Sequence, residues 1–115
     1  MKISVDDKVR VIATNEYNIP IGTIAYVIDF TEKENGYTYY VIQIEDKHYV
    51  VPQSCIGAEV SELSYKVGDR VIISDFNGKY SNRVSVIVEL TEYPRGYVLE
   101  NSPGIRWYEN EIELY

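Results

Sequence analysis

An internal repeat limits the folds open to this chain more than any other feature of its sequence. Four segments of the first half return in the same order in the second half: 5–12 as 67–74, 27–32 as 87–92, 40–42 as 97–99, and 51–56 as 107–112. The offset between matching segments shrinks along the chain, which indicates short loop deletions between matching strands. The sequence therefore predicts two copies of one small β unit.

Alternating hydrophobicity, the pattern of a half-buried strand, dominates both copies. The repeat predicts a strand with one apolar face in each copy: Ile24, Tyr26, Ile28 and Phe30 in the first, and Val84, Val86, Val88 and Leu90 in the second, where the opposite face is wetter. Hairpin turns are predicted at 34–37, where Asn-Gly accepts positive φ, and at 93–96. A strand is expected over 38–44, followed by a terminal turn that plugs the unit with Ile56. No helix longer than about one turn is predicted.

The chain is long enough for one ordinary domain or two very small ones. Its 115 residues divide into expected units at 1–60 and 63–115, joined by a linker over 57–64 that is neither Gly/Ser-rich nor Pro-rich. We expect part of this linker to close the first unit as a final strand. Domains of about 60 residues bury only about 60% of the surface of the unfolded chain, so we expect the two units to support each other.

Short motifs in both copies resemble a known class of domain. The second copy opens with V-G-D-x-V-x-I at 67–73, the first contains I-G-T-I-A-Y-V at 21–27, and W-Y precedes E-I near the C-terminal end. The pattern resembles bacterial SH3-like small barrels, in particular short SH3-like proteins of phages and mobile elements of low-GC Gram-positive bacteria, and more loosely KOW-type barrels. The resemblance covers almost the whole chain, twice. It implies an all-β chain of two tandem SH3-like small barrels.

The two copies depart from this shared pattern at two loops. The first copy has Asp6 where the second has Gly68, and the second has Asn82-Arg83 where the first has Gly22-Thr23. The acidic loop and paired Trp of PxxP-binding SH3 domains have no counterpart in this sequence. The resemblance therefore predicts a fold rather than a ligand, because small barrels carry many unrelated functions.

Charge and cysteine content narrow the possible functions. Eleven Lys and Arg residues against 18 Asp and Glu give a net charge of −7, which opposes binding to nucleic acid or anionic membranes unless a local basic patch overrides it. Cys55 is alone, so neither a disulfide nor a cysteine-based metal cluster is expected. The chain has neither the apolar core of a signal peptide nor a run long enough to span a membrane. We expect a cytoplasmic protein that does not contact membranes.

Catalytic, metal and cofactor sites are not predicted. His48 and Cys55 lie on consecutive elements, but no Asn or Asp is placed to orient the histidine as a nucleophilic pair requires. The carboxylate clusters lack the spacing of a cation-binding loop, and we expect them to face water at strand edges: Asp6-Asp7, Glu45-Asp46, and Glu109 with Glu111 and Glu113. We therefore expect a protein that is not an enzyme and holds no cofactor.

Two binding surfaces are predicted. Tyr and Trp are favoured at protein interfaces, and aromatic or apolar residues recur in the equivalent loops of the two copies and near the C-terminal end: Tyr17, Ile19, Phe76, Tyr80, Trp107 and Tyr108. The alternative is a KOW-like nucleic-acid site on the second copy, built from Lys79, Arg83, Arg95 and Arg106 beside aromatic rings. Packing of the same rings between the two units is the structural alternative.

The resulting hypothesis is a protein-binding module, encoded by a phage or mobile element, that acts as an adaptor or as an inhibitor of a host protein. If the target normally binds nucleic acid, an acidic inhibitor would compete with the nucleic acid because its carboxylates resemble phosphate groups. A structural role in a larger assembly is a further hypothesis, and the sequence leaves the oligomeric state open.

Overall fold

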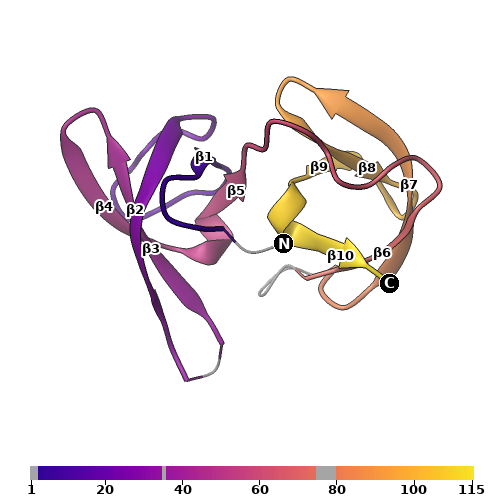
Figure 1. Cartoon of the computed structure of the whole chain (residues 1–115), viewed down its shortest axis with the longest axis horizontal. Helices are drawn as coiled ribbons and strands as arrows, with labels where there is room; N and C mark the ends of the chain where they lie inside the picture. Colours follow the sequence, from indigo (N-terminus) through magenta and orange to yellow (C-terminus); the bar gives the residue numbers. More distant parts are fainter. Residues whose placement is uncertain (1–2, 35, 75–79) are drawn as a thin grey trace. The chain divides into compact units, whose positions relative to one another are not determined.

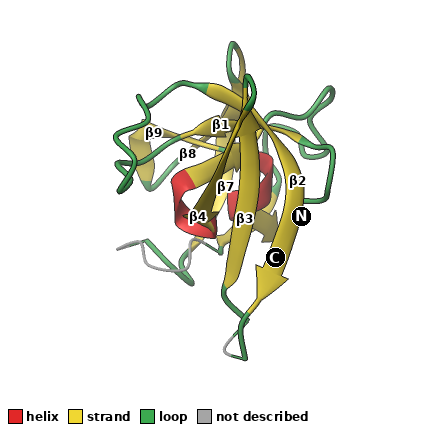
Figure 2. Cartoon of the chain, turned by 90° about the vertical axis from the view of Figure 1, so that its left-hand side faces the viewer, coloured by secondary structure: helices red, strands yellow, loops and turns green. Residues whose placement is uncertain are grey.

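The computed structural model describes residues 3–34, 36–74 and 80–115. Within these residues the secondary structure consists of ten β-strands and two single turns of 3₁₀ helix, so the chain is all-β as expected (Figures 1 and 2). Two compact units divide the chain, Ile3–Ala58 and Glu59–Tyr115, here called the first and second units.

The first unit is one antiparallel sheet. Its elements are β1 (Lys8–Val11), β2 (Ile24–Glu32), β3 (Thr38–Ile44), β4 (Lys47–Pro52), the 3₁₀ turn η1 (Gln53–Cys55) and β5 (Ile56–Ala58). The order across the sheet is β4-β3-β2-β1-β5. The predicted strand over 38–44 is confirmed, Ile56 is fully buried after the terminal turn, and the start of the predicted linker does supply the last strand.

The second unit repeats this arrangement. Its elements are β6 (Arg70–Ile73), β7 (Val84–Glu92), β8 (Arg95–Leu99), β9 (Ser102–Trp107), the 3₁₀ turn η2 (Glu109–Glu111) and β10 (Ile112–Leu114). The sheet order is β10-β6-β7-β8-β9. Read from the other edge, as β9-β8-β7-β6-β10, it matches the order of the first unit strand for strand. Among the described residues no ladder joins β4 to β5 or β9 to β10, so the sheets are not closed barrels by hydrogen bonding.

The two loops whose sequences differ between the copies keep one backbone conformation. Asp6 has φ 75° where Gly68 has φ 96°, and Asn82 has φ 66° where Gly22 has φ 99°. The Asp6 and Gly68 amides donate to the carbonyls of Val27 and Ile87 at 2.7 and 2.8 Å. Asp and Asn are the residues other than glycine that tolerate this left-handed region, so both substitutions preserve the turn.

Before a bulge, the predicted apolar faces of the two long strands point away from the core, whereas Phe30 and Leu90 beyond it pair with the buried Tyr40 and Tyr97. The buried residues are Ala25 and Val27 on β2, and Ser85 and Ile87 on β7. Val27 pairs with the fully buried Ile42, and a bulge follows in both units, between Val27 and Asp29 and between Ile87 and Glu89. Both faces of these strands carry apolar residues, so alternation alone did not identify the inner face. Pairing with the neighbouring strands determines which face points into the core.

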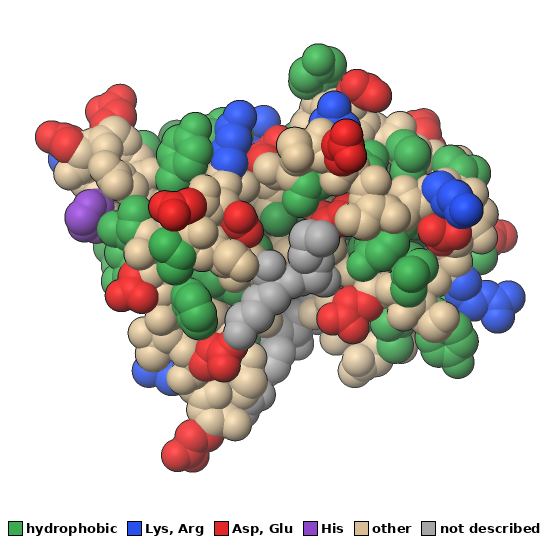
Figure 3. Space-filling view, in the orientation of Figure 1, with side chains coloured by type: hydrophobic (Ala, Val, Ile, Leu, Met, Phe, Trp, Pro, Cys, Tyr) green, Lys and Arg blue, Asp and Glu red, His purple; other side chains and the backbone are tan. Residues whose placement is uncertain are grey.

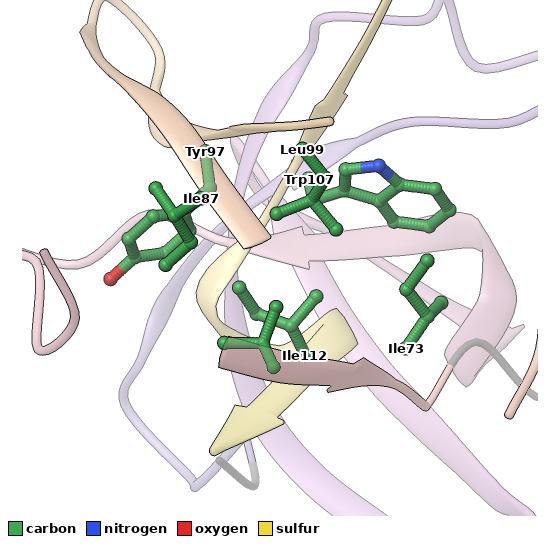
Figure 4. Packing of buried hydrophobic residues seen from close by; sticks show 7 residues of the cluster. Ile73, Ile87, Tyr97, Leu99, Trp107 and Ile112 are labelled. Atoms are coloured by element: carbon green, nitrogen blue, oxygen red, sulfur yellow. The ribbon is translucent and has the colours of Figure 1, made fainter. Parts of the chain in front are cut away.

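Each unit has its own core. In the second unit, Ile87 and Ile112 pack with buried side chains from the other strands: Val71, Ile73, Tyr97, Leu99 and Trp107 (Figure 4). The corresponding positions of the first unit are also buried, including Val9, Val11 and Ile42. Both sheets therefore already use one face for packing, which leaves the opposite face available for contacts.

Candidate binding surface

The predicted loop residues of the first unit separate into one exposed and one buried side chain. Tyr17 is exposed and lies edge-to-face with Tyr49, with ring centroids 5.0 Å apart. Ile19 is buried, because the loop curls around Asn15: the Asn15 Oδ1 accepts the Ile19 amide at 3.0 Å and its Nδ2 donates to the Ile19 carbonyl at 3.0 Å. The expectation that Ile19 faces a partner is therefore wrong, and Asn15, which sequence reasoning missed, is the reason.

The predicted aromatic residues of the second unit are largely internal. Phe76 and Lys79 lie outside the described residues. Trp107 is only 3% exposed, and its Nε1 donates to Ser102 Oγ at 2.8 Å. Tyr108 is also buried, and the half-buried Tyr80 lies edge-on to Trp107 at 5.8 Å. Trp107 and Tyr108 therefore serve packing, which corrects the expectation that they present a recognition surface.

The arginines of the second unit do not form a basic row. The Arg83 guanidinium lies 5.9 Å from the centre of the Tyr80 ring. Arg106 pairs across the sheet with Val98, whose other partner is Glu89, and Arg95 at the start of β8 is half-buried. Acidic, basic and apolar side chains alternate over the visible surface in Figure 3. Mixed charges of this kind weaken the field that would attract a phosphate backbone.

The lone cysteine and histidine occupy different environments. Cys55 in η1 is buried, and its thiol donates to the Thr14 carbonyl at 3.6 Å. Burial raises the pKa of the Cys55 thiol, which is the opposite of what a nucleophile needs. His48 is exposed on β4, opposite Gln43. Within the described residues no three side chains of the His, Cys, Asp or Glu type gather as a metal site would require.

The outward side of the first sheet carries several apolar side chains among polar ones. Cross-strand partners share a face of a sheet, so the pairing of β1 to β4 defines this surface. We call it the first outer face, and it consists of Lys8, Tyr26, Gln43, His48, Asp29, Val41, Val50, Thr31, Tyr39 and Pro52. Tyr26 is 52% exposed and Val50 is 47% exposed, although Val41 and Tyr39 beside them are half-buried.

Cations border this apolar strip. Lys8 lies directly across from Tyr26, and Lys33 Nζ lies 5.6 Å from the centre of the Tyr39 ring. Arg10 pairs with Ile24 in the next row, and its guanidinium donates to the Gly22 carbonyl at 2.9 Å. Asp29 is the one acidic member of the first outer face as the strand pairing defines it. Glu32 and Glu34 lie at the hairpin end of this surface and Glu45 and Asp46 at its other end, so charges of both signs surround the apolar side chains.

The second sheet presents a comparable surface with different charges. Arg70 pairs with Val86, and Ile72 with Val84, while Val84 and Val88 are 41% and 47% exposed. A shallow cleft of about 480 Å³ lies here, lined by Arg70, Val84, Ser85, Val86, Glu100 and Asn101. Glu113 of β10 pairs with Ile72, so carboxylates accompany the arginine. The outward side of this sheet is apolar but balanced in charge.

A buried carboxylate in the second unit was missed by sequence reasoning. Glu109 was expected at a water-facing strand edge, but it is fully buried: Tyr97 Oη donates to its Oε2, and the Ser64 amide donates to its Oε1 at 3.0 Å. The Tyr65 amide in turn donates to Tyr97 Oη at 3.1 Å. Burial, and then the bond to Glu109, raises the pKa of the Tyr97 hydroxyl well above its usual range. Figure 4 shows this hydroxyl pointing out of the apolar cluster.

Comparison with known proteins assigns no function to this chain, so a functional assignment rests on the surfaces described above. The chain matches none of the models of known protein families, and none of the curated proteins is similar to it in sequence. The helical turns of the described residues are all too short and too polar to cross a membrane.

Proposed function

We propose that this chain is a non-enzymatic module that binds another protein through the first outer face. Antiparallel sheets with one packed face usually turn polar side chains outward. Here the inward side is already filled by the core, yet Tyr26 and Val50 remain about half exposed beside Val41 and Tyr39. Contiguous exposed apolar surface rimmed by charges is typical of protein interaction sites.

The proposal includes the fold assignment. Each unit is a member of the SH3-like small barrels, supported by the repeated opening motif, the five short antiparallel strands and the buried plug residue after a 3₁₀ turn. The resemblance to small phage and mobile-element proteins supports a role as an adaptor or as an inhibitor of a host protein. Trp107, Tyr108 and Ile19 are left out of the binding surface because they are buried.

Site-specific photo-crosslinking tests this function. A photoreactive phenylalanine analogue replaces Tyr26, and the control chain carries it at Asp46 in the β3–β4 turn, which is also exposed but polar. In nuclease-treated lysate of a low-GC Gram-positive bacterium, we expect one protein crosslinked from position 26 and not from position 46. Equal labelling from both positions, or a crosslink that disappears with nuclease, would contradict the proposal. The second result would favour the nucleic-acid alternative.

A further inference from the structure

The first sheet ends in an open strand edge at β4. Among the described residues, β3 is the one strand that pairs with β4 (Figure 1). The two strands are joined by a two-residue turn, so the flanking pair, Ile44 and Lys47, is hydrogen-bonded. Hydrogen-bonded and non-hydrogen-bonded pairs alternate along an antiparallel ladder, so the N–H and C=O groups of His48 and Val50 point away from β3. In the described part of the chain, hydrogen bonds outside the ladders do not engage the backbone of either residue.

The matching edge of the second unit is interrupted. Its edge strand β9 contains Pro103 and Gly104, and its pairing with β8 is irregular between Val98 and Leu99. Proline cannot donate to a ladder, and prolines and bulges are devices by which natural proteins keep sheet edges from pairing. The six-residue strand β4 instead pairs with β3 without irregularity, and its one proline, Pro52, ends the strand. Of these two matching edges, the first is therefore the regular one that another strand can join.

Aromatic and apolar side chains flank the β4 edge on both sides of the sheet. Tyr49 shares the inner side with its buried cross-strand partner Ile42, and its ring lies edge-to-face with that of the exposed Tyr17, with centroids 5.0 Å apart. Val50 is exposed on the outer side, as is His48. Tyrosine supplies contact area at a low entropic cost. The edge therefore has side chains suited to an interface as well as open backbone groups.

We propose that a second copy of this chain pairs with this edge, β4 against β4, antiparallel about a two-fold axis at Tyr49. His48 of each copy then lies across from Val50 of the other, and every open N–H meets an open C=O. The edge is complementary to itself because its two open residues are separated by a single residue. A contact of this kind uses the same patch on both copies and closes as a dimer.

Two features of the strand select this register. Pairing of Val50 with its own counterpart brings His48 opposite Pro52, which has no N–H, so the His48 carbonyl lacks a donor. Pairing of His48 with its own counterpart brings Val50 opposite Asp46, which belongs to the turn rather than to the strand. The register centred on Tyr49 satisfies both open residues of each copy within the strand.

The charges along β4 permit the pairing even though the chain has a net charge of −7. In the register centred on Tyr49, Asp46 of one copy lies across from Pro52 of the other, and Lys47 lies across from Val51. The acidic turns of the two copies therefore lie at opposite ends of the paired strands. Like charges destabilise a ladder when they are directly opposed, and this register opposes none along the strand. An extended segment of another protein is not constrained in this way, so a second copy is the occupant that the edge itself specifies.

The inference goes beyond the proposed function, which a monomer can also perform. Pairing through β4 joins the first outer faces of two copies into one continuous surface, because Val50 of each copy lies beside His48 of the other on that side. Two linked faces bind a repeated or symmetric partner more tightly than one face does. The contact involves one six-residue strand from each copy, so we expect a dimer that dissociates on dilution, with a Kd of about 10–100 µM.

Disulfide trapping tests the register. In a Cys55→Ala background, Tyr49→Cys places one thiol of each copy at the two-fold axis, where paired Cβ atoms lie about 4.5 Å apart and a disulfide can form. Asp46→Cys is the matched control, because residue 46 is exposed but lies about 20 Å from its counterpart in this register. With oxidised glutathione as the oxidant, we expect a covalent dimer from position 49 and not from position 46. Equal yields from both positions mean random collision and overturn the proposal.

Sedimentation equilibrium of the full chain, at concentrations up to about 1 mM, tests the open backbone groups. Val50→Pro removes one open N–H but no ladder bond to β3, so we expect the fold to be retained and the Kd of the dimer to rise at least about tenfold. Val50→Thr keeps the N–H and the branched shape, and it should change the Kd less than about threefold. Hydrogen exchange of the Ile42 amide reports whether β3 and β4 stay paired in both variants.

Two results in sedimentation overturn the proposal. One is a chain that stays monomeric at about 1 mM, and the other is a dimer that Val50→Pro leaves intact, because association then uses another surface. If Val50→Pro unfolds the first unit, the comparison of positions 49 and 46 decides. The proposed function fails separately, because a crosslink from position 26 to another protein does not require the dimer.

Discussion

The two units share one strand arrangement but differ in the polar side chain that forms hydrogen bonds from the 3₁₀ turn of each unit. Gln53 of the first unit and Glu109 of the second occupy matching places in the repeat. Gln53 Oε1 accepts a single backbone amide, that of Thr38, at 2.8 Å. Glu109 instead accepts from both Tyr97 Oη and the Ser64 amide, and so connects η2 with the segment that leads into β6. The duplicated fold thus tolerates a neutral contact in one copy and a buried charge in the other.

This difference shows which features the fold itself demands. The turn hydrogen bonds, the bulge and the strand order are the same in both units. The buried polar group and the outer face differ, so neither is needed to form a five-stranded unit of this kind. Features that vary between two copies of one fold are where separate functions can be placed. The first unit carries the first outer face, and in the second unit Glu109 and Tyr97 hold the amides of Ser64 and Tyr65 in the segment that leads into β6.

Removal of the buried carboxylate should have the largest effect and sharpens the comparison. Glu109→Ala leaves the Tyr97 hydroxyl and the Ser64 amide without their acceptor, so we expect a loss of about 3 kcal/mol in the free energy of unfolding. Gln53→Ala removes one amide bond and should cost about 1 kcal/mol. Urea unfolding followed by fluorescence of Trp107, the single tryptophan, reports the second unit, and hydrogen exchange of the β3 amides reports the first.

Glu109→Gln is the matched control, because it keeps an oxygen acceptor while removing the charge. We expect its cost to lie between those of the two alanine variants. If Glu109→Ala and Gln53→Ala destabilise their own units equally, the buried carboxylate contributes nothing beyond an ordinary hydrogen bond, and the contrast between the units disappears.

Alkaline pH should destabilise the second unit more than the first. Burial, and then Glu109, raises the pKa of Tyr97, and burial with the charges of Glu109 and Glu113 raises that of Tyr65. In the first unit burial similarly raises the pKa of Tyr40, with a smaller contribution from Asp7. A raised folded-state pKa gives stability that is complete below the unfolded value of about 10 and is lost as pH rises above it. The first unit also has two such groups, because burial raises the pKa of the Cys55 thiol as well, but the rise is largest for Tyr97 of the second unit.

Urea midpoints between about pH 8 and pH 11 measure this difference, with Trp107 fluorescence and β3 hydrogen exchange as the reporters of the two units. Tyr97→Phe should be less stable than the parent chain near neutral pH, because Glu109 loses a donor, and should show a shallower decline above about pH 10. If the urea midpoints of the parent chain and the variant decline in parallel with pH, Tyr97 is not responsible for the loss of stability at alkaline pH.

The sequence predicted the strands better than the direction in which their side chains point. Alternation and turn residues located the 38–44 strand, and the repeat located its partner in the second copy. The inner face of β2 was wrong because small Ala25 and Val27 face inward while larger Tyr26 faces water. Size and hydrophobicity cannot identify the core when both faces of a strand are apolar, since cross-strand neighbours make that choice.

The candidate site was harder to predict for a related reason. Exposed aromatic residues were expected in loops, but the Trp107 indole has a hydrogen-bond partner in Ser102 that allows it to be buried. Glu109 gave no signal in the sequence that separates it from its solvent-exposed neighbour Glu113. The first outer face emerges only after four strands are aligned in register, because its residues come from separate segments.

Exchanging the turn residues between copies should have the smallest effect and tests how similar the units are. Asp6→Gly relieves a left-handed conformation worth about 1 kcal/mol, but it also increases the entropy of the unfolded chain by about the same amount. We therefore expect Asp6→Gly and Gly68→Asp each to change the free energy of unfolding by less than about 0.5 kcal/mol. Gly68→Val should cost about 1–2 kcal/mol, because a β-branched residue does not tolerate φ 96°. If Gly68→Asp is as damaging as Gly68→Val in urea unfolding, the shared hydrogen bond to β7 depends on glycine itself, and the two turns are alike only in shape.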